Sequence, residues 1–493
     1  MSAAAATRAA EIAPRISQRT RLGLALGLGG LCVVLDTTIA VVAVPALMRE
    51  FNAPLATMQW TTTAYLLALV TTLPLAARLS TRYGARRVYV SAILVFGLAS
   101  ALAGLASGPA TLIAARVLQG LGGGLLNPVG MILVMRGVPA HERGRVTSLL
   151  GLPVLVGPLC GPILSGWLID SWSWRAIFFI TVPPALVAAA LVRHWAPRDE
   201  PGDREPLDVV GLGLLLPGAT VSVFGLGEAS FSPVARIALM VLGVALLTAF
   251  VLRSRRVAAP LLRVRLLWRP SIAINVSVLV LFGAAYFGSM LLMPTYVQVI
   301  RGDSALMAGT MAIPAALATG VSLQICTRLV DRVAPWRVVT VGLSMALAGS
   351  IGTVLVLRAD TSYAVLMALA ALTGAGSGGV IMPGMTAAMR ELNGPDLASG
   401  SSVMGLAQQL ASAVGTAGIT ALLAAAIAWQ VPGLDGGLEA VSRMAPGARA
   451  ALAPDLVAGQ RIAQLAAVVL IAVALVVATT LMRTSSDRKQ GEQ

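Results

Sequence analysis

Long apolar segments constrain this chain more than any other feature of its sequence. Fourteen segments of about twenty residues or more are almost free of charge, and a helix of about that length crosses a bilayer. They run over residues 22–48, 57–77, 88–107, 109–134, 146–169, 176–195, 208–228, 234–252, 271–299, 305–327, 337–357, 361–387, 397–428 and 460–482. Only 12% of the residues are charged, whereas a soluble domain carries about 25%. The sequence therefore predicts an all-α polytopic membrane protein with 14 transmembrane helices.

The distribution of basic residues predicts how these helices are oriented. Most of the 36 lysines and arginines lie at the two chain ends and in every second connection, as the positive-inside rule requires of cytoplasmic segments. This alternation predicts an even number of helices with both termini in the cytoplasm. It also accounts for the net charge of +15, so we expect no nucleic-acid partner.

Two charged residues lie in the interior of apolar segments, well away from the segment ends. Asp36 is the one charged residue between Arg21 and Arg49, and Arg116 lies in the segment 109–134. A charge near the bilayer centre costs about 2.5–3.5 kcal/mol on insertion scales, and such residues usually face a substrate or proton pathway. The alternative for both is a structural hydrogen bond or ion pair. Whether Arg116 reaches Asp36 is left open by the sequence.

The sequence offers little for catalysis or for a metal. Its three cysteines lie in apolar segments without the spacing of a disulfide framework or a metal site, and it has only two histidines. No HExxH, P-loop or serine-nucleophile elbow is present. We therefore expect neither an enzyme nor a cofactor, and a membrane enzyme or receptor remains the least favoured alternative. Cys32, one turn before Asp36, is a candidate for the same surface.

An internal repeat is visible in two basic turns that follow apolar segments. They are RLSTRYGARR, residues 78–87, and RLVDRVAPWR, residues 328–337. Two similar halves with a site between them form one known transporter architecture.

Together these motifs resemble the major facilitator superfamily, specifically its fourteen-helix branch of drug:proton antiporters (EmrB/QacA type). The stretch LDTTIAVVAVPAL, residues 35–47, is similar to the first-helix motif of that branch, with Asp36 as its acid. The stretch ARVLQGLGGG, residues 115–124, resembles the motif whose arginine, here Arg116, is tied to proton coupling. Gly157-Pro158 and Gly161-Pro162 resemble the antiporter motif that bends the fifth helix.

The basic turns resemble the superfamily motif that latches the cytoplasmic side, with departures. The first copy keeps four of the motif's residues but has Thr81 where an aspartate is usual, whereas the second copy keeps Asp331 and Arg332. The four are Arg78, Gly84, Arg86 and Arg87. The replacement puts the first latch in doubt.

The resemblance implies two six-helix halves with two extra helices between them. The parts are a cytoplasmic segment (1–21), the first half (22–195), a linker (196–207), the extra pair (208–252), a cytoplasmic loop (253–270), the second half (271–482, with a long outer connection at 429–459) and a tail (483–493). It further implies a monomer in a bacterial cytoplasmic membrane, with lipids, protons and small lipophilic substrates as partners.

The implied function is proton-coupled efflux of lipophilic neutral or cationic compounds by alternating access. The alternative is dedicated export of one metabolite, antibiotic, lipid or siderophore. Candidate cavity residues are Cys32, Gln119, Asn127, Tyr286, Met290, Met293 and Gln409. Methionine suits adaptable binding surfaces, although Tyr286, Met290 and Met293 could equally pack in the core or face lipid.

Overall fold

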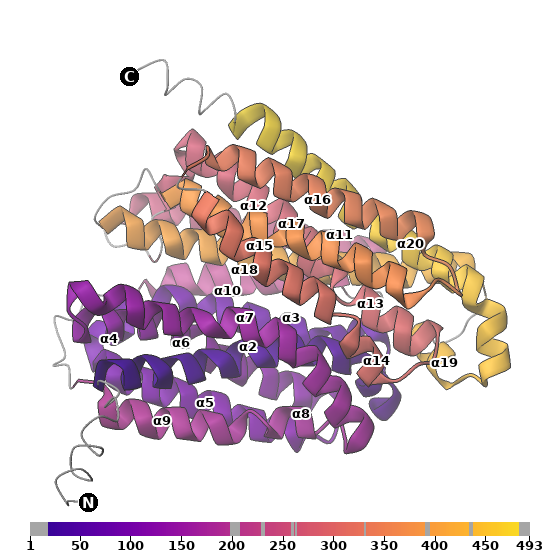
Figure 1. Cartoon of the computed structure of the whole chain (residues 1–493), viewed down its shortest axis with the longest axis horizontal. Helices are drawn as coiled ribbons and strands as arrows, with labels where there is room; N and C mark the ends of the chain where they lie inside the picture. The colour runs from indigo at the N-terminus through magenta and orange to yellow at the C-terminus, as the bar shows by residue number, and fades with distance from the viewer. Residues whose placement is uncertain are drawn as a thin grey trace, which may run out of the picture.

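The helices run side by side along one direction and form an elongated bundle (Figure 1). The structure, a computed structural model, describes residues 18–197, 208–227, 232–257, 261, 264–329, 332–389, 395–432 and 437–482. Helix α2 begins, and the last helical segment ends, at the same end of the bundle. We call this the basic end because it carries Arg82, Arg86, Arg87 and Arg193; the opposite one is the far end.

The first group of helices precedes residue 198. It comprises α2 (Gln18–Phe51), α3 (Leu55–Thr72), η1 (Leu73–Leu75), α4 (Ala76–Tyr83), α5 (Ala85–Gly104), α6 (Pro109–Gly137), α7 (Ala140–Ser171), α8 (Ala176–Phe179) and α9 (Val182–Trp195). Gly84 joins α4 to α5 with a φ of 87°, a conformation that favours glycine. Pro109 starts α6, where its missing N–H costs no hydrogen bond.

The second group begins after two further helices, α10 (Val209–Gly227) and α11 (Pro233–Arg256). It comprises η2 (Val264–Trp268), α12 (Pro270–Ser289), α13 (Leu292–Thr295), η3 (Tyr296–Ile300), α14 (Ala305–Thr310), α15 (Ile313–Leu329), α16 (Pro335–Val356), α17 (Tyr363–Met389), α18 (Pro395–Gln430), α19 (Gly437–Arg443), α20 (Pro446–Val477) and η4 (Ala478–Met482).

Thirteen helices of the described part of the chain are long and apolar enough to cross a membrane. They coincide with all the predicted segments except 146–169. That segment lies within α7, a continuous helix of 32 residues with three internal prolines. The all-helical, membrane-spanning fold is thus confirmed, and the count of fourteen spans stays a prediction for α7.

The two groups repeat one packing pattern. In the first group, α2 packs on α7 and α9, α6 packs on α3 and α5, and α5 packs on α9. In the second group, α12 packs on α18 and α20, α17 packs on α15 and α16, and α16 packs on α20. The groups meet where α3 contacts α18 and where α7 contacts α14 and α15. Six helices in one group thus correspond to six in the other, which explains the repeated basic turn.

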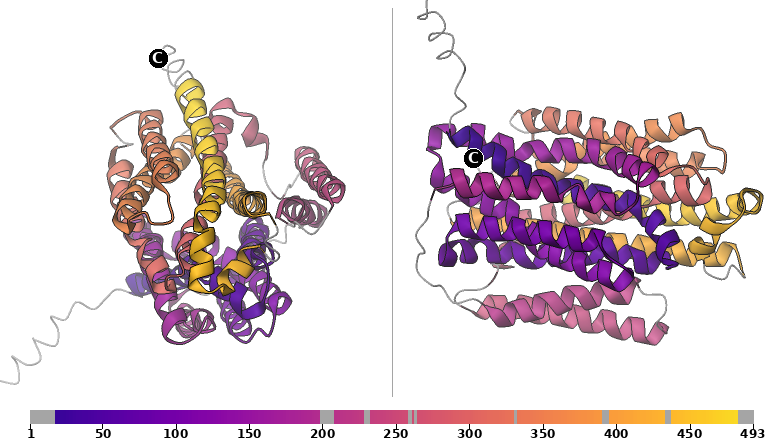
Figure 2. Two further views of the ribbon diagram at one scale, coloured as in Figure 1. Left: turned by 90° about the vertical axis from the view of Figure 1, so that its right-hand side faces the viewer. Right: turned by 90° about the horizontal axis from the view of Figure 1, so that it is seen from below.

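Helices α10 and α11 form a pair at the side of the bundle (Figure 2). Helix α10 packs against both α3 and α18, and Phe224 contacts Trp60 with ring centroids 5.1 Å apart. Asp208 links α10 to α11 at the basic end. Its carboxylate accepts hydrogen bonds from the Gly211 amide on α10 and from the Arg253 guanidinium on α11. Burial alone would raise the pKa of Asp208, but these two partners, together with the Leu261 backbone, outweigh it and hold that pKa below its ordinary value.

The connection predicted at 429–459 is largely helical. It contains α19, and α20 begins at Pro446 rather than near residue 460. The extension is stabilised by packing, because Leu456 and Val457 are buried and Gly459 lies directly against Ile427 of α18. The last apolar segment therefore belongs to a helix that continues past the membrane at the far end.

Candidate functional site

Asp36 lies in the middle of α2 with protein on all sides. Its side chain is 2% exposed, and α2 itself is buried along most of its length. An unpaired carboxylate in such a place would cost several kcal/mol. The surrounding helices must therefore supply its partners.

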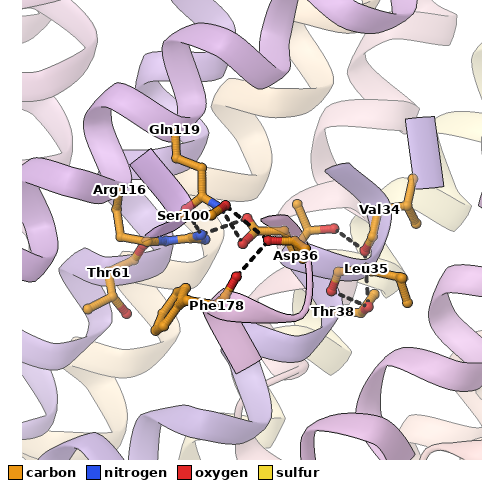
Figure 3. Close-up of polar contacts among 11 residues, drawn as sticks. Val34, Leu35, Asp36, Thr38, Thr61, Ser100, Arg116, Gln119 and Phe178 are labelled. Carbon is orange, nitrogen blue, oxygen red and sulfur yellow. Dashed lines mark hydrogen bonds and ion pairs between the residues drawn. The ribbon is translucent and has the colours of Figure 1, made fainter. Parts of the chain in front are cut away.

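Arg116 on α6 provides the opposite charge. Its side chain is 0% exposed, and Nη1 donates to Oδ2 of Asp36 over 2.6 Å. Nε donates to the backbone carbonyl of Thr61 on α3 over 2.8 Å (Figure 3). The guanidinium thus joins three helices of the first group.

Gln119 closes the network from the next turn of α6. Its Oε1 accepts from Nη1 of Arg116 over 2.6 Å, and its Nε2 donates to Oδ1 of Asp36 over 2.7 Å. Nε2 also donates to Oγ of Ser100 on α5, which in turn accepts from the Thr181 hydroxyl. Both oxygens of the Asp36 carboxylate are therefore occupied, and we call Asp36, Arg116, Gln119, Ser100 and Thr181 the buried polar network.

Aromatic rings cover the guanidinium. Its Cζ lies 4.2 Å from the ring centroid of Tyr65 and 5.8 Å from that of Phe178. Cation–π contacts of this kind strengthen when water is excluded. Within the described residues, Nη2 of Arg116 and the Tyr65 hydroxyl have no hydrogen-bond partner. One NH2 group of the guanidinium, with both of its N–H donors, thus remains free for a rearranged set of contacts.

This arrangement can link protonation to movement. A carboxylate holds the guanidinium by charge and by hydrogen bonding, whereas a protonated Asp36 would attract it far less. Arg116 would then keep its charge in a buried place without its counter-ion, which favours a different helix arrangement. Proton binding at Asp36 is therefore able to shift a conformational equilibrium.

An apolar cavity of about 180 Å³ lies between the two groups. The first group contributes residues of α2 and α7, and the second contributes residues of α12, α13, α14, α15, α16, α17 and α20. Among the described residues, no charged side chain lines it. Its polar members include Thr38, Tyr286, Ser289, Gln460 and Gln464.

The cavity adjoins the buried polar network through α2. Thr38 lines the cavity two residues after Asp36, and its hydroxyl donates to backbone carbonyls of its own helix and of Gly157 on α7. A Cβ atom at Gly157 or Gly161 would collide with the side chain of Val34 or Thr38, respectively. Glycine at these positions therefore lets α7 lie directly on the turn that holds Asp36.

Contacts between the groups close the far end. Asp170 at the end of α7 accepts hydrogen bonds from the amides of Ala305 and Leu306, at 3.1 and 2.7 Å. Nε2 of Gln298 on η3 donates to the carbonyl of Val42 on α2 over 2.9 Å. The largest buried apolar cluster also joins far-end residues of both groups, including Leu47 and Tyr296. Far-end access to the cavity would require these contacts to break.

Replacing Asp170 with alanine should shift the protein towards a state that is open at the far end. Hydrogen bonds to a charged group contribute about 1.5–3 kcal/mol when shielded, and less at an exposed site. Double electron–electron resonance would measure the distance between spin labels that replace Trp172 and Asp360 at the far end. The distance distribution should then contain a larger population at long distances. Glu50→Ala, which breaks an ion pair within the first group, is the matched control. An unchanged distance distribution in Asp170→Ala would show that Asp170 is not a latch.

The predicted cavity residues fall into two sets. Tyr286, Met290 and Met293 line the cavity. Gln119 belongs to the buried polar network, and Cys32 is buried with its Sγ 3.9 Å from the Thr181 carbonyl. The exposed Asn127 and the half-buried Gln409 lie outside the lining.

The residues predicted to control conformational change also lie in different parts of the structure. Pro158 and Pro162 line the cavity, and Pro162 presses against Gly309 of the second group. In the basic turn, Arg86 donates to the Ala196 carbonyl over 3.3 Å and Arg87 is exposed. Arg78 is half-buried on α4 and Arg332 is exposed, while Asp331 lies outside the described residues. Thr81 donates to Ala77 within its own helix.

The sequence analysis missed several members of the site. Ser100, Thr181 and the Thr61 carbonyl carry no sequence signal, because hydroxyls in membrane helices usually bond their own backbone, as Thr37 does. Gln119 could have been assigned to the network, since it lies three residues after Arg116 and shares its helix face.

Comparison with known proteins decides the family. The family model described as Major Facilitator Superfamily matches residues 26–416, which include Asp36, Arg116 and most of the cavity. The chain belongs to the major facilitator superfamily. This major facilitator protein is accordingly a transporter and not an enzyme.

Relatives of this transporter include drug-resistance proteins. It is 35% identical over 427 residues to the "Multidrug resistance protein B homolog" of Mycobacterium tuberculosis (strain ATCC 25618 / H37Rv), covering 83% of this chain and 79% of the relative. It is 33% identical over 398 residues to a "Puromycin resistance protein" of Streptomyces alboniger, covering 78% of each. The chain is therefore a multi-pass membrane transporter with bacterial relatives.

Solved structures agree on the fold. A bacterial homolog of the human lysosomal transporter Spinster, in an inward-facing and occupied conformation, matches with a TM-score of 0.67 at 16% identity. The match covers 94% of this chain and 97% of that one. At this identity the likeness concerns the fold alone.

Proposed function

We propose that this protein is a proton-coupled efflux transporter of the fourteen-helix drug:proton antiporter branch, exporting lipophilic neutral or cationic compounds. The observation that carries the proposal is the buried Asp36–Arg116 ion pair, whose acid lies on α2 two residues before Thr38, a lining residue of the apolar cavity between the two groups. Proton binding at Asp36 and substrate binding in the cavity act on the same stretch of α2. Relatives named for multidrug resistance support this reading.

The arrangement suits a bacterial cytoplasmic membrane with the basic end inside. The basic end then lies in the cytoplasm together with both termini, as the positive-inside rule favours. The closed far end makes this a state without access from outside. Protonation from outside and substrate loading from inside would alternate, and a monomer contains every part of the site.

Transport into liposomes tests the proposal. The purified protein is reconstituted with an acidic lumen, and uptake of ethidium and of a neutral lipophilic dye is followed. Each pH unit is worth about 1.4 kcal/mol per proton, or a tenfold accumulation. We expect accumulation that collapses when an ionophore removes the gradient. Dye uptake that does not depend on the pH gradient would contradict proton coupling.

A dedicated exporter of one natural product is the second candidate. A "Tetracenomycin C resistance and export protein" of Streptomyces glaucescens is 28% identical over 410 residues, and the puromycin resistance protein is similar over most of the chain. Both names refer to single antibiotics. Failure of every general dye in the liposome assay, with movement of one polyaromatic antibiotic, would favour this candidate.

Gln460 should select substrates that carry a hydrogen-bond donor. Its Nε2 donates to the Leu292 carbonyl over 2.9 Å, which leaves Oε1 as a buried acceptor without a partner among the described residues. Rhodamine 6G has N–H groups that tetramethylrhodamine ethyl ester lacks. Wild-type protein should favour rhodamine 6G, and Gln460→Met should lose that preference while Gln464→Met retains it. Equal transport of both dyes by wild-type protein would contradict this role.

A further inference from the structure

Three arginines surround a groove on the outside of the bundle, away from the substrate cavity. The groove lies at the basic end between α5 and α9 and has a volume of about 500 Å³. Arg86 and Arg87 on α5 and Arg193 on α9 supply its charge, and Val90 and Leu94 supply its apolar floor. Figure 1 places α5 and α9 together at the edge of the bundle.

The groove opens towards the space that lipid fills. Arg87, Ser91, Leu94 and Leu98 follow one another at helical spacing on α5 and are all exposed. Leu98 is 64% exposed and Leu94 is 42% exposed, as expected of side chains that contact acyl chains. The guanidinium of Arg87 therefore lies at the basic end of a lipid-facing stripe, at the depth of the head groups.

The charge of the groove is not balanced within the described residues. Arg86 is held between the two helices by its hydrogen bond to the Ala196 carbonyl. No ion pair of Arg86, Arg87 or Arg193 is found among the described residues. Thr81, at the position of the turn motif's usual acid, is neutral. The arginines consequently present a positive surface to the membrane interface.

We propose that this groove binds an anionic glycerophospholipid. The phosphate would accept hydrogen bonds from the guanidinium groups of Arg86, Arg87 and Arg193, for which arginine is well suited. The acyl chains would lie on Val90 and Leu94. A basic pocket at the cytoplasmic ends of membrane helices provides this combination of charge and apolar surface. The occupant is a lipid rather than a free phosphate because the apolar floor continues directly into the lipid-facing stripe.

Binding to the full-length protein in detergent tests the proposal. Native mass spectrometry and thermal unfolding would compare phosphatidylglycerol, cardiolipin, phosphatidylcholine and sn-glycerol 3-phosphate. We expect the two anionic lipids to bind and to raise the melting temperature. Equal effects of phosphatidylcholine would overturn the role of charge, and equal effects of glycerol phosphate would overturn the role of the apolar floor.

Variants assign the binding to the groove. Arg87→Gln/Arg193→Gln should weaken phosphatidylglycerol binding on the order of thirtyfold, because each basic group near an anionic surface contributes on the order of fivefold in affinity. Arg332→Gln, which removes an exposed arginine at the same end but outside the groove, should bind as wild type does. Equal weakening by Arg332→Gln, or none by the double variant, would show only general attraction to the basic end. Unchanged melting temperatures without lipid would confirm that the variants fold.

Discussion

Asp36→Asn abolishes gradient-driven accumulation while the protein still folds and binds substrate. Asparagine keeps the shape of the side chain, and its one amide oxygen can still accept a hydrogen bond from Arg116, but it cannot take up a proton. Because the proton gradient then no longer drives transport, substrate accumulation should fall from about tenfold per pH unit to the passive level. Substrate exchange without a gradient should continue, because the cavity lining is unchanged.

The control for this variant is Asp360→Asn, which alters an exposed acid at the far end. It should accumulate substrate as wild type does. Fluorescence-detected gel filtration and dye binding would establish that both variants are folded. Undiminished accumulation by Asp36→Asn would move the coupling site elsewhere in the chain.

Arg116→Met should have the largest effect on stability. It leaves the Asp36 carboxylate buried without its counter-ion and removes the bond to the Thr61 carbonyl. Breaking one partner of a buried ion pair costs about 3–5 kcal/mol. We expect a markedly lower melting temperature and little transport.

A double variant distinguishes the loss of the ion pair from the loss of side-chain packing as the cause of the lower stability. Asp36→Asn/Arg116→Met removes both charges, so the melting temperature should recover towards that of wild type, whereas accumulation should remain absent. Arg116→Lys keeps the charge but cannot reach Asp36, Gln119 and Thr61 together, and should transport poorly. A double variant no more stable than Arg116→Met would show that the ion pair is not what stabilises this region.

Much of the fold was predictable because the membrane imposes simple rules. The apolar segments located thirteen spans, and the same reasoning singled out Asp36 and Arg116, since a charge in such a segment needs a partner. Helix ends outside the membrane were less predictable. Helix α20 begins at Pro446, a residue favoured at a first helical position, and its later turn at Gly459 packs on Ile427 of α18, which hydropathy does not record.

The site was predictable only in part because its partners are ordinary residues. Gln119 was assigned to the cavity, yet it bonds Asp36 and Arg116 at short range. Gln460 and Gln298 were not among the predicted site residues, since their roles depend on backbone carbonyls of distant helices. Contacts between segments far apart in the chain leave no local pattern in the sequence.

Proton movement driven by substrate tests the central claim most directly. Liposomes containing the protein and a lumenal pH dye are prepared without a gradient, and a step of substrate concentration is applied from outside. Wild-type protein should release lumenal protons as substrate enters, so the lumen becomes alkaline, and Asp36→Asn should give no pH change while substrate still equilibrates. Substrate entry without proton movement in wild type, or equal proton movement in Asp36→Asn, would contradict coupling through Asp36.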